Sequence, residues 1–124
     1  MRILQILAAA AALTLVHAGA QAAGDIDAGK TKSATCAACH GADGNGVEGN
    51  SPSPGFPIPI LAGQYQDYLA RALEDYKTGK RKHPIMAGFA ATLSAQDRED
   101  LAAYFASQKT SLYTVQYSEG LEGQ

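Results

Sequence analysis

The segment Cys36-Ala37-Ala38-Cys39-His40 (CAACH) holds both cysteines of the chain and one of its three histidines within five consecutive residues. Two thiols at this spacing can form a disulfide, a thiol redox pair or half of a zinc site. Together with the histidine that follows them, they can also anchor a haem covalently. Which of these four kinds of site is present decides the fold as well as the function. The rest of the sequence is needed to distinguish among them.

The first 22 residues have the features of a secretory signal peptide. Met1-Arg2 is a short positive start, residues 3–16 are almost all apolar, and Ala20-Gln21-Ala22 has the small-x-small form of a cleavage site. The apolar run is shorter than the roughly 20 residues that a membrane-spanning helix needs. We therefore expect an exported, periplasmic protein with a cleaved signal peptide over residues 1–22, rather than a retained membrane anchor.

The remaining chain is long enough for one domain. The full sequence has 10 Lys and Arg residues against 12 Asp and Glu residues, a net charge of −2, so nothing favours binding to nucleic acid. A domain of about 100 residues buries a modest share of its surface and often depends on a disulfide, a metal or a cofactor. We expect one domain over residues 23–109 and a C-terminal tail over residues 110–124.

Three segments have helical periodicity and helix boundary signals: residues 26–39, 64–78 and 95–108. Asp25 or Asp27 can cap the first, and Gly79 ends the second. Ser94 and Asp97 have the spacing of a capping box at the start of the third. Since no stretch alternates polar and apolar residues as a strand does, the fold class is all-α.

The second and third segments have apolar faces at helical spacing. The face of the second comprises Tyr65, Tyr68, Leu69, Ala72, Leu73 and Tyr76, and that of the third comprises Leu101, Tyr104 and Phe105. The acidic residues Asp97, Glu99 and Asp100 are interpreted as charges that favour a helix start.

Two long segments lack any period. Residues 41–62 contain five Gly and four of the five Pro, and residues 79–93 form a second irregular segment, which carries Met86 and Phe89. Such segments are uncommon in a compact domain unless they are functional or wrap something. The run Pro57-Ile58-Pro59-Ile60-Leu61 places apolar side chains on extended backbone. We expect the helices and loops together to enclose a bound group.

Three of the four kinds of site fit the CAACH segment poorly. A disulfide between Cys36 and Cys39 would close a very small ring and stabilise little. Redox CxxC pairs begin a helix that follows a strand, whereas this one ends a predicted helix. A structural zinc site needs four protein ligands, and beyond this segment the candidates reduce to His83 or a carboxylate.

The histidine after the second cysteine favours haem, because C-x-x-C-H is the attachment signature of haem c. Residues three apart on a helix project to the same side, so Cys36 and Cys39 can both form thioethers along one haem edge. His40 then binds the iron as one axial ligand. For the other axial position we favour Met86, the only methionine after Met1, since His/Met ligation is typical of electron transfer. His83 remains the alternative.

Three stretches resemble the class I cytochrome c family: CAACHGADGNG (36–46), PILAGQYQDYLARALEDYKTGKR (59–81) and HPIMAGFAATLSAQDREDLAAYFAS (83–107). Within the family, the similarity is greatest to the short cytochromes c553 and to one half of the dihaem cytochromes c4. It covers residues 25–109 and implies three main helices and long loops around one covalently bound haem c, because a second CxxCH is absent. It implies the roles of Cys36, Cys39, His40 and Met86 given above.

The resemblance implies two further contacts. The carbonyl of Pro59 is expected to accept the other ring N–H of His40, which would fix the tautomer, although Pro57 lies two residues away. The first and last helices are expected to cross closely at Gly29, where Tyr104 or Phe105 could press in.

Two axial ligands leave no open position on the iron for a substrate, so we expect an electron carrier and not an enzyme. Its partners would be membrane or periplasmic redox proteins, and it is expected to be a monomer. A basic cluster could dock it to an acidic surface or could simply complement a helix dipole: Lys77, Lys80, Arg81 and Lys82. The alternatives are a haem subunit of a larger dehydrogenase or oxidase, and a gas- or peroxide-binding haem protein.

Overall fold

The computed structural model describes residues 23–47 and 57–110. These residues form five helices and no strand: α1 (Ile26–Lys32), α2 (Ala34–His40), α3 (Gln66–Thr78), α4 (Pro84–Ala91) and α5 (Ala95–Ala106). The all-α prediction is therefore confirmed for the described part of the chain. The predicted signal peptide, and the predicted tail beyond Thr110, lie outside the described residues.

The first predicted helix is divided in two at Ser33. Asp25 caps α1 as predicted, since its side chain accepts a hydrogen bond from the N–H of Ala28 at 2.8 Å. Ser33 is buried, and its hydroxyl donates to the carbonyl of Lys30 at 2.8 Å. A side chain that bonds the backbone in this way competes with the regular helical ladder, and α2 starts anew at the next residue.

The prediction that residues 79–93 are irregular is wrong, because α4 forms within them. Pro84 occupies the first turn of α4, a position where its fixed φ is favourable. The sequence PIMAGFAA is apolar on every side and only eight residues long, so it has no two-faced pattern to detect. Met86 therefore lies on a helix, not in a loop.

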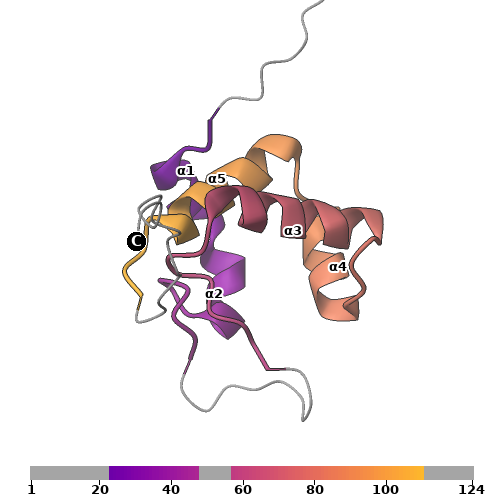
Figure 1. Ribbon diagram of the computed structural model, residues 1–124, viewed down its shortest axis with the longest axis horizontal. Coiled ribbons are helices and arrows are strands. Elements are labelled where there is room, and N and C mark those ends of the chain that lie inside the picture. The colour runs from indigo at the N-terminus through magenta and orange to yellow at the C-terminus, as the bar shows by residue number, and fades with distance from the viewer. Residues whose placement is uncertain (1–22, 48–56, 111–124) are drawn as a thin grey trace, which may run out of the picture.

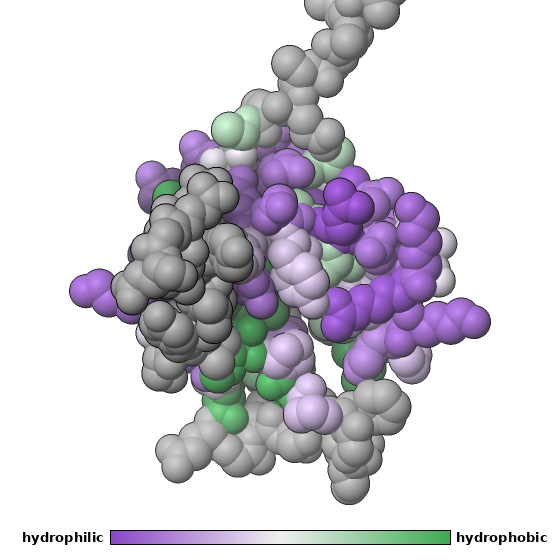
Figure 2. Space-filling model, viewed as in Figure 1, coloured by the Kyte–Doolittle hydropathy of each residue, from purple (hydrophilic) through white to green (hydrophobic). Residues whose placement is uncertain are grey.

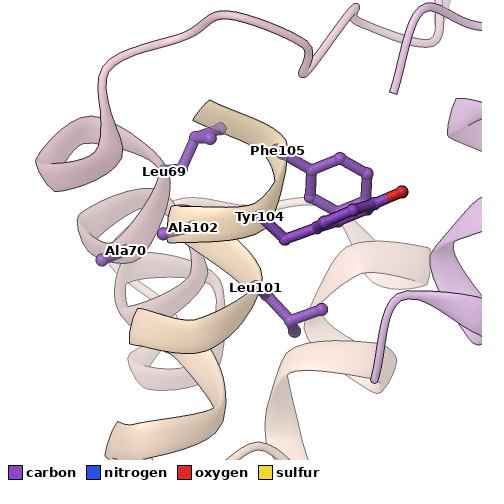
Figure 3. Packing of buried hydrophobic residues seen from close by; sticks show 6 residues of the cluster. All are labelled: Leu69, Ala70, Leu101, Ala102, Tyr104 and Phe105. Atoms are coloured by element: carbon purple, nitrogen blue, oxygen red, sulfur yellow. The ribbon is translucent and has the colours of Figure 1, made fainter. Parts of the chain in front are cut away.

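The boundary signals of the other two helices are confirmed. Gly79 ends α3 in a left-handed conformation with a φ of 78°, and Ser94 and Asp97 form a capping box at the start of α5. The predicted apolar face of α3 is partly wrong, because Tyr65 and Tyr68 are 50% and 48% exposed. The core lies between α3 and α5 and is shown in Figure 3; it consists of Leu69, Ala70, Leu101, Ala102, Tyr104 and Phe105.

α5 packs against both α1 and α3, and α4 packs against α3 (Figure 1). Gly29 lies at the crossing of α1 and α5. A Cβ atom added there would overlap the carbonyl of Asp100 and lie 2.7 Å from the Cβ of Tyr104. The predicted close crossing is thus confirmed for Tyr104, while Phe105 faces Gly44 instead.

Asp100 is more than a helix-start charge. It is 2% exposed, and its carboxylate accepts hydrogen bonds from the backbone N–H of Asp25 at 2.9 Å and the amide of Gln96 at 2.8 Å. Lys32 also bonds it and forms an ion pair with Asp97 at 2.7 Å. The hydrogen bond from Asp25 and then that from Lys32 hold the pKa of Asp100 below its usual range. This network ties the start of the domain to α5.

Candidate functional site

α2 carries the whole CAACH segment and ends at His40. Cys36 and Cys39 are half-buried and are not joined in a disulfide. Burial raises the pKa of the Cys36 thiol, and the nearby Cys39 adds to the effect. Both sulfurs lie three residues apart on one helix, where i and i+3 side chains share a face. Both cysteines can therefore be attached covalently to one group on this side of α2, whereas a redox pair of this kind follows a strand, and the described residues form none.

His40 is 7% exposed, and its ring is held by one backbone oxygen. The Nδ1 atom lies 2.9 Å from the carbonyl oxygen of Pro59, so the contact expected from the resemblance is present at Pro59 rather than Pro57. Because a carbonyl can only accept, the ring proton resides on Nδ1 in this bond. The Nε2 lone pair is then the one available for a metal.

Met86 and His83 are brought together at the start of α4, but in different roles. His83 is the N-cap of α4, and its Nδ1 atom accepts a hydrogen bond from the N–H of Met86 at 3.4 Å. Its ring also meets Tyr76 edge to face, with centroids 6.3 Å apart. The imidazole of His83 is thus directed at the backbone of its own helix, while the half-buried Met86 side chain makes no hydrogen bond within the described residues.

α4 has apolar side chains that no described part of the chain covers. Ile85 and Phe89 are 49% and 47% exposed, and with Pro84 and Gly88 they line a shallow hollow. α2 and α4 lie apart on the same side of α3 and do not pack on each other (Figure 1). Hydrophobic atoms are exposed in this region (Figure 2). Since a helix that is apolar on all sides needs cover on all sides, the site fits an apolar group such as haem between the two helices.

The described residues form no closed metal site. Within residues 23–47 and 57–110, no group of three or more His, Cys, Asp or Glu side chains converges as metal ligands would. A structural zinc site needs four protein ligands. The zinc interpretation of Cys36, Cys39 and His40 therefore finds no fourth partner in the described chain.

The predicted basic cluster is divided between two tasks. Lys77 donates to the carbonyl of Leu93, and Arg81 lies 4.8 Å from the centre of the Tyr76 ring and bonds the Tyr68 hydroxyl at 3.2 Å. These two cations tie the end of α3 to its surroundings. Lys80 and Lys82 are exposed, in the strongly hydrophilic surface near the α3–α4 connection (Figure 2).

Comparison with known proteins identifies the family. The family model described as Cytochrome c matches residues 26–109, which is most of the chain. The chain belongs to the cytochrome c family. Cytochrome c4 of Pseudomonas aeruginosa is 54% identical over 101 residues, which cover 81% of this chain and 47% of that protein. The crystal structure of reduced recombinant cytochrome c4 from Pseudomonas stutzeri has a TM-score of 0.61 and 46% identity, and covers 73% of this chain and 48% of that one.

The chain thus spans about half the length of the cytochromes c4 that it matches. A further relative, named thiosulfate dehydrogenase electron acceptor, from Thiomonas intermedia, is 40% identical over 64% of this chain and 34% of that protein. The cytochrome c fold is confirmed by these findings. So is the cofactor: this cytochrome c binds haem c through Cys36 and Cys39.

Sequence reasoning missed the loop that follows the haem-attachment segment. Gly41, Gly44 and Gly46 have φ values of 81°, 79° and 93°, a backbone conformation that glycine adopts without strain. Three glycines in six residues directly after CAACH are the signal that could have revealed a tightly wound loop.

In the described residues, no helix has the length and apolar character to cross a membrane.

Proposed function

We propose that this cytochrome c is an exported electron carrier and not an enzyme, with His40 and Met86 as the axial ligands of its haem. The observation that carries the proposal is the hydrogen bond of 2.9 Å between His40 Nδ1 and the Pro59 carbonyl, which leaves Nε2 for iron. When bound, haem supplies a one-electron couple between Fe(III) and Fe(II).

The residues around the haem would serve to hold it and would not take part in a reaction themselves. The Pro59 carbonyl fixes the tautomer of His40 and raises its basicity as a ligand. The apolar side chains of α4 that line the hollow would keep water away from the haem, and a Met thioether would raise its reduction potential. If His40 and Met86 both held the iron, no position would be left on it for a substrate.

Met86 is favoured over His83 because His83 is already engaged. Its Nδ1 atom accepts the capping hydrogen bond from the N–H of Met86, so the neutral ring carries its proton on Nε2. Ligation through Nε2 would move that proton to Nδ1 and break the cap of α4. Met86 lies one turn further along the same helix, and its side chain takes no part in capping that helix.

The partners proposed are other redox proteins. The relative named thiosulfate dehydrogenase electron acceptor supports this class of partner. Of the basic cluster, Lys80 and Lys82 are the cations best placed to steer an acidic partner, because Lys77 and Arg81 are engaged within the fold. A fixed haem subunit of a dehydrogenase is the second candidate, and it differs from a free carrier in purifying with a partner chain.

The visible absorption spectrum of two matched variants tests the ligand assignment. We expect the oxidised wild-type protein to show the weak near-red band of sulfur-to-iron ligation. Met86→Leu should lose this band, and His83→Asn should keep it, because Asn is also a good N-cap for α4. Retention of the band in Met86→Leu would contradict His40/Met86 ligation. Its absence from the wild-type protein would do the same and would favour the bis-histidine or gas-binding alternatives.

A further inference from the structure

The backbone after His40 closes on itself through hydrogen bonds. The N–H of Gly46 donates to the carbonyl of His40 at 2.7 Å, and the N–H of Gly44 donates to Gly41 at 3.1 Å. Residues 41–46, called here the 41–46 loop, therefore turn back toward the end of α2. The positive φ angles of its glycines allow this winding.

The 41–46 loop also forms hydrogen bonds with the segment that contains Pro59. The carbonyl of Gly44 accepts hydrogen bonds from the N–H groups of Leu61 at 2.7 Å and Ala62 at 3.1 Å. Pro59 lies two residues before Leu61, and its carbonyl accepts from the ring of His40. The connection thus runs from His40 along the loop to Gly44, across to Leu61, and back through Pro59 to the imidazole.

Two consecutive residues of α5 bind the two segments of this connection. These segments, called here its two arms, are the one that follows His40 and the one that follows Pro59. The buried Tyr104 donates its hydroxyl hydrogen to the carbonyl of Ala42 at 2.9 Å, on the arm that follows His40. The carbonyl of Phe105 accepts from the N–H of Gly63 at 3.0 Å, on the arm that follows Pro59. Figure 3 shows the two rings leaving the same side of α5, with the Tyr104 hydroxyl outermost.

The fit between loop and helix leaves little freedom. A Cβ atom added to Gly44 would lie 2.7 Å from Cδ1 of Phe105 and 3.0 Å from the nitrogen of Ala62. Gly44 therefore packs directly between the Phe105 ring and the second arm. A shift of the loop would move Gly44 and, through Leu61, the carbonyl of Pro59.

We propose that the 41–46 loop is a clamp that positions His40, and that the Tyr104 hydroxyl is a positioning group acting through it. The hydroxyl sets the separation of the two arms and so keeps the Pro59 carbonyl on Nδ1 of His40. This rests on the proposed function, in which His40 is the ligand. A tighter bond to Pro59 makes the imidazole a stronger donor and lowers the reduction potential.

The test compares Tyr104→Phe with Tyr65→Phe in the haem-loaded protein. Both remove one phenol hydroxyl, but the Tyr65 side chain is half exposed and its hydroxyl makes no hydrogen bond in the described part of the chain. In Tyr104→Phe we expect faster hydrogen exchange at His40 Nδ1 and at the amides of Leu61 and Ala62, by roughly tenfold for one lost hydrogen bond. The amide of Leu69, in α3, should not change, and the reduction potential should rise. Tyr65→Phe should match the wild-type protein throughout.

Two results would overturn the inference while leaving the proposed function intact. The first is unchanged exchange and potential in Tyr104→Phe with a wild-type spectrum. The second is equal acceleration at every amide, Leu69 included, which would mean that Tyr104 only stabilises the fold. A wild-type spectrum without nitrogen ligation would instead overturn both the proposed function and the inference.

A second variant covers the case in which Tyr104→Phe does not fold. Asn45 ties the same loop to the chain after α5, since its side-chain amide donates to the carbonyl of Lys109 at 2.9 Å. Asn45→Ala removes this surface tie without touching the core. The same local acceleration, smaller in size, is expected at His40, Leu61 and Ala62, and no acceleration would overturn the clamp.

Discussion

At the scale of single residues, Gly29 shows how a missing side chain brings two distant parts of the chain together. The carbonyl of Asp100 and the Cβ of Tyr104 occupy the space that a side chain would need. The first clash is with backbone, which cannot rotate away. α1 can therefore cross α5 at this distance only with glycine at position 29.

Gly29→Val is expected to destabilise the protein by about 3 kcal/mol, the upper end of the usual cost of overpacking. Thr31→Val is the matched control, because it places the same residue on the exposed side of the same helix. Its effect should stay within about 0.5 kcal/mol. Thermal melts of both variants measure the difference, and equal melting temperatures would refute the crossing argument.

At the scale of elements, the buried carboxylate of Asp100 joins the start of the domain to α5. It receives hydrogen bonds from the backbone of Asp25, from Lys32 and from Gln96. These bonds lower the pKa of Asp100, and those from Lys32 and Ser94 lower the pKa of Asp97. A carboxyl with a lowered pKa in the folded state stabilises the fold above its unfolded pKa of about 3.9. That contribution is lost as the pH falls through the folded value.

The free energy of unfolding should therefore fall as the pH is lowered below about 4. Asp100→Asn should destabilise the protein by about 1–3 kcal/mol at pH 7, because hydrogen bonds to a charged group are lost. The same variant should also show a less steep fall of the free energy of unfolding below about pH 4, the acid limb of the stability profile. Glu99→Gln, a change at the adjacent residue of α5, should keep the wild-type profile. Denaturant titrations from pH 7 to pH 2 check this, and parallel acid limbs in wild type and Asp100→Asn would refute it.

At the scale of the whole molecule, charge is unevenly placed. The chain has a net charge of −2, yet Lys80, Arg81 and Lys82 are consecutive and exposed, just before the helix that carries Met86. A local cationic surface on an acidic protein attracts anions to that surface, and it orients them there as they approach. Screening by salt weakens such steering, since the Debye length is about 10 Å at 0.1 M ionic strength.

The rate of oxidation by ferricyanide, an anion, should fall as salt is added. The double variant Lys80→Gln with Lys82→Gln should react about two- to tenfold more slowly at low ionic strength and respond less to salt. Oxidation by tris(1,10-phenanthroline)cobalt(III), a cation, should not be slowed. Lys30→Gln, on α1, is the control for lost charge elsewhere. Stopped-flow kinetics measure the three proteins with both oxidants, and equal ferricyanide rates in the wild type and the double variant would remove the steering role.

The sequence by itself determined the attachment chemistry and most of the local structure. CAACH specifies its chemistry through residue type and spacing, and the caps at Asp25, Ser94 and Gly79 act over three or four residues. Local interactions of this kind are written in adjacent residues, so they could be predicted. The contact of His40 with Pro59 is different, because it joins residues 19 positions apart and was predicted from the resemblance to a family.

Only the tertiary structure decided the features that depend on distant partners. α4 has no periodic pattern because it is apolar on every side, and it forms against α3. Tyr68 fits an apolar stripe but is half exposed because α5 covers Leu69 and Ala70 instead. The tie of Tyr104 to Ala42 joins residues 62 positions apart. Such contacts exist only after packing has brought the elements together, and no local pattern records them.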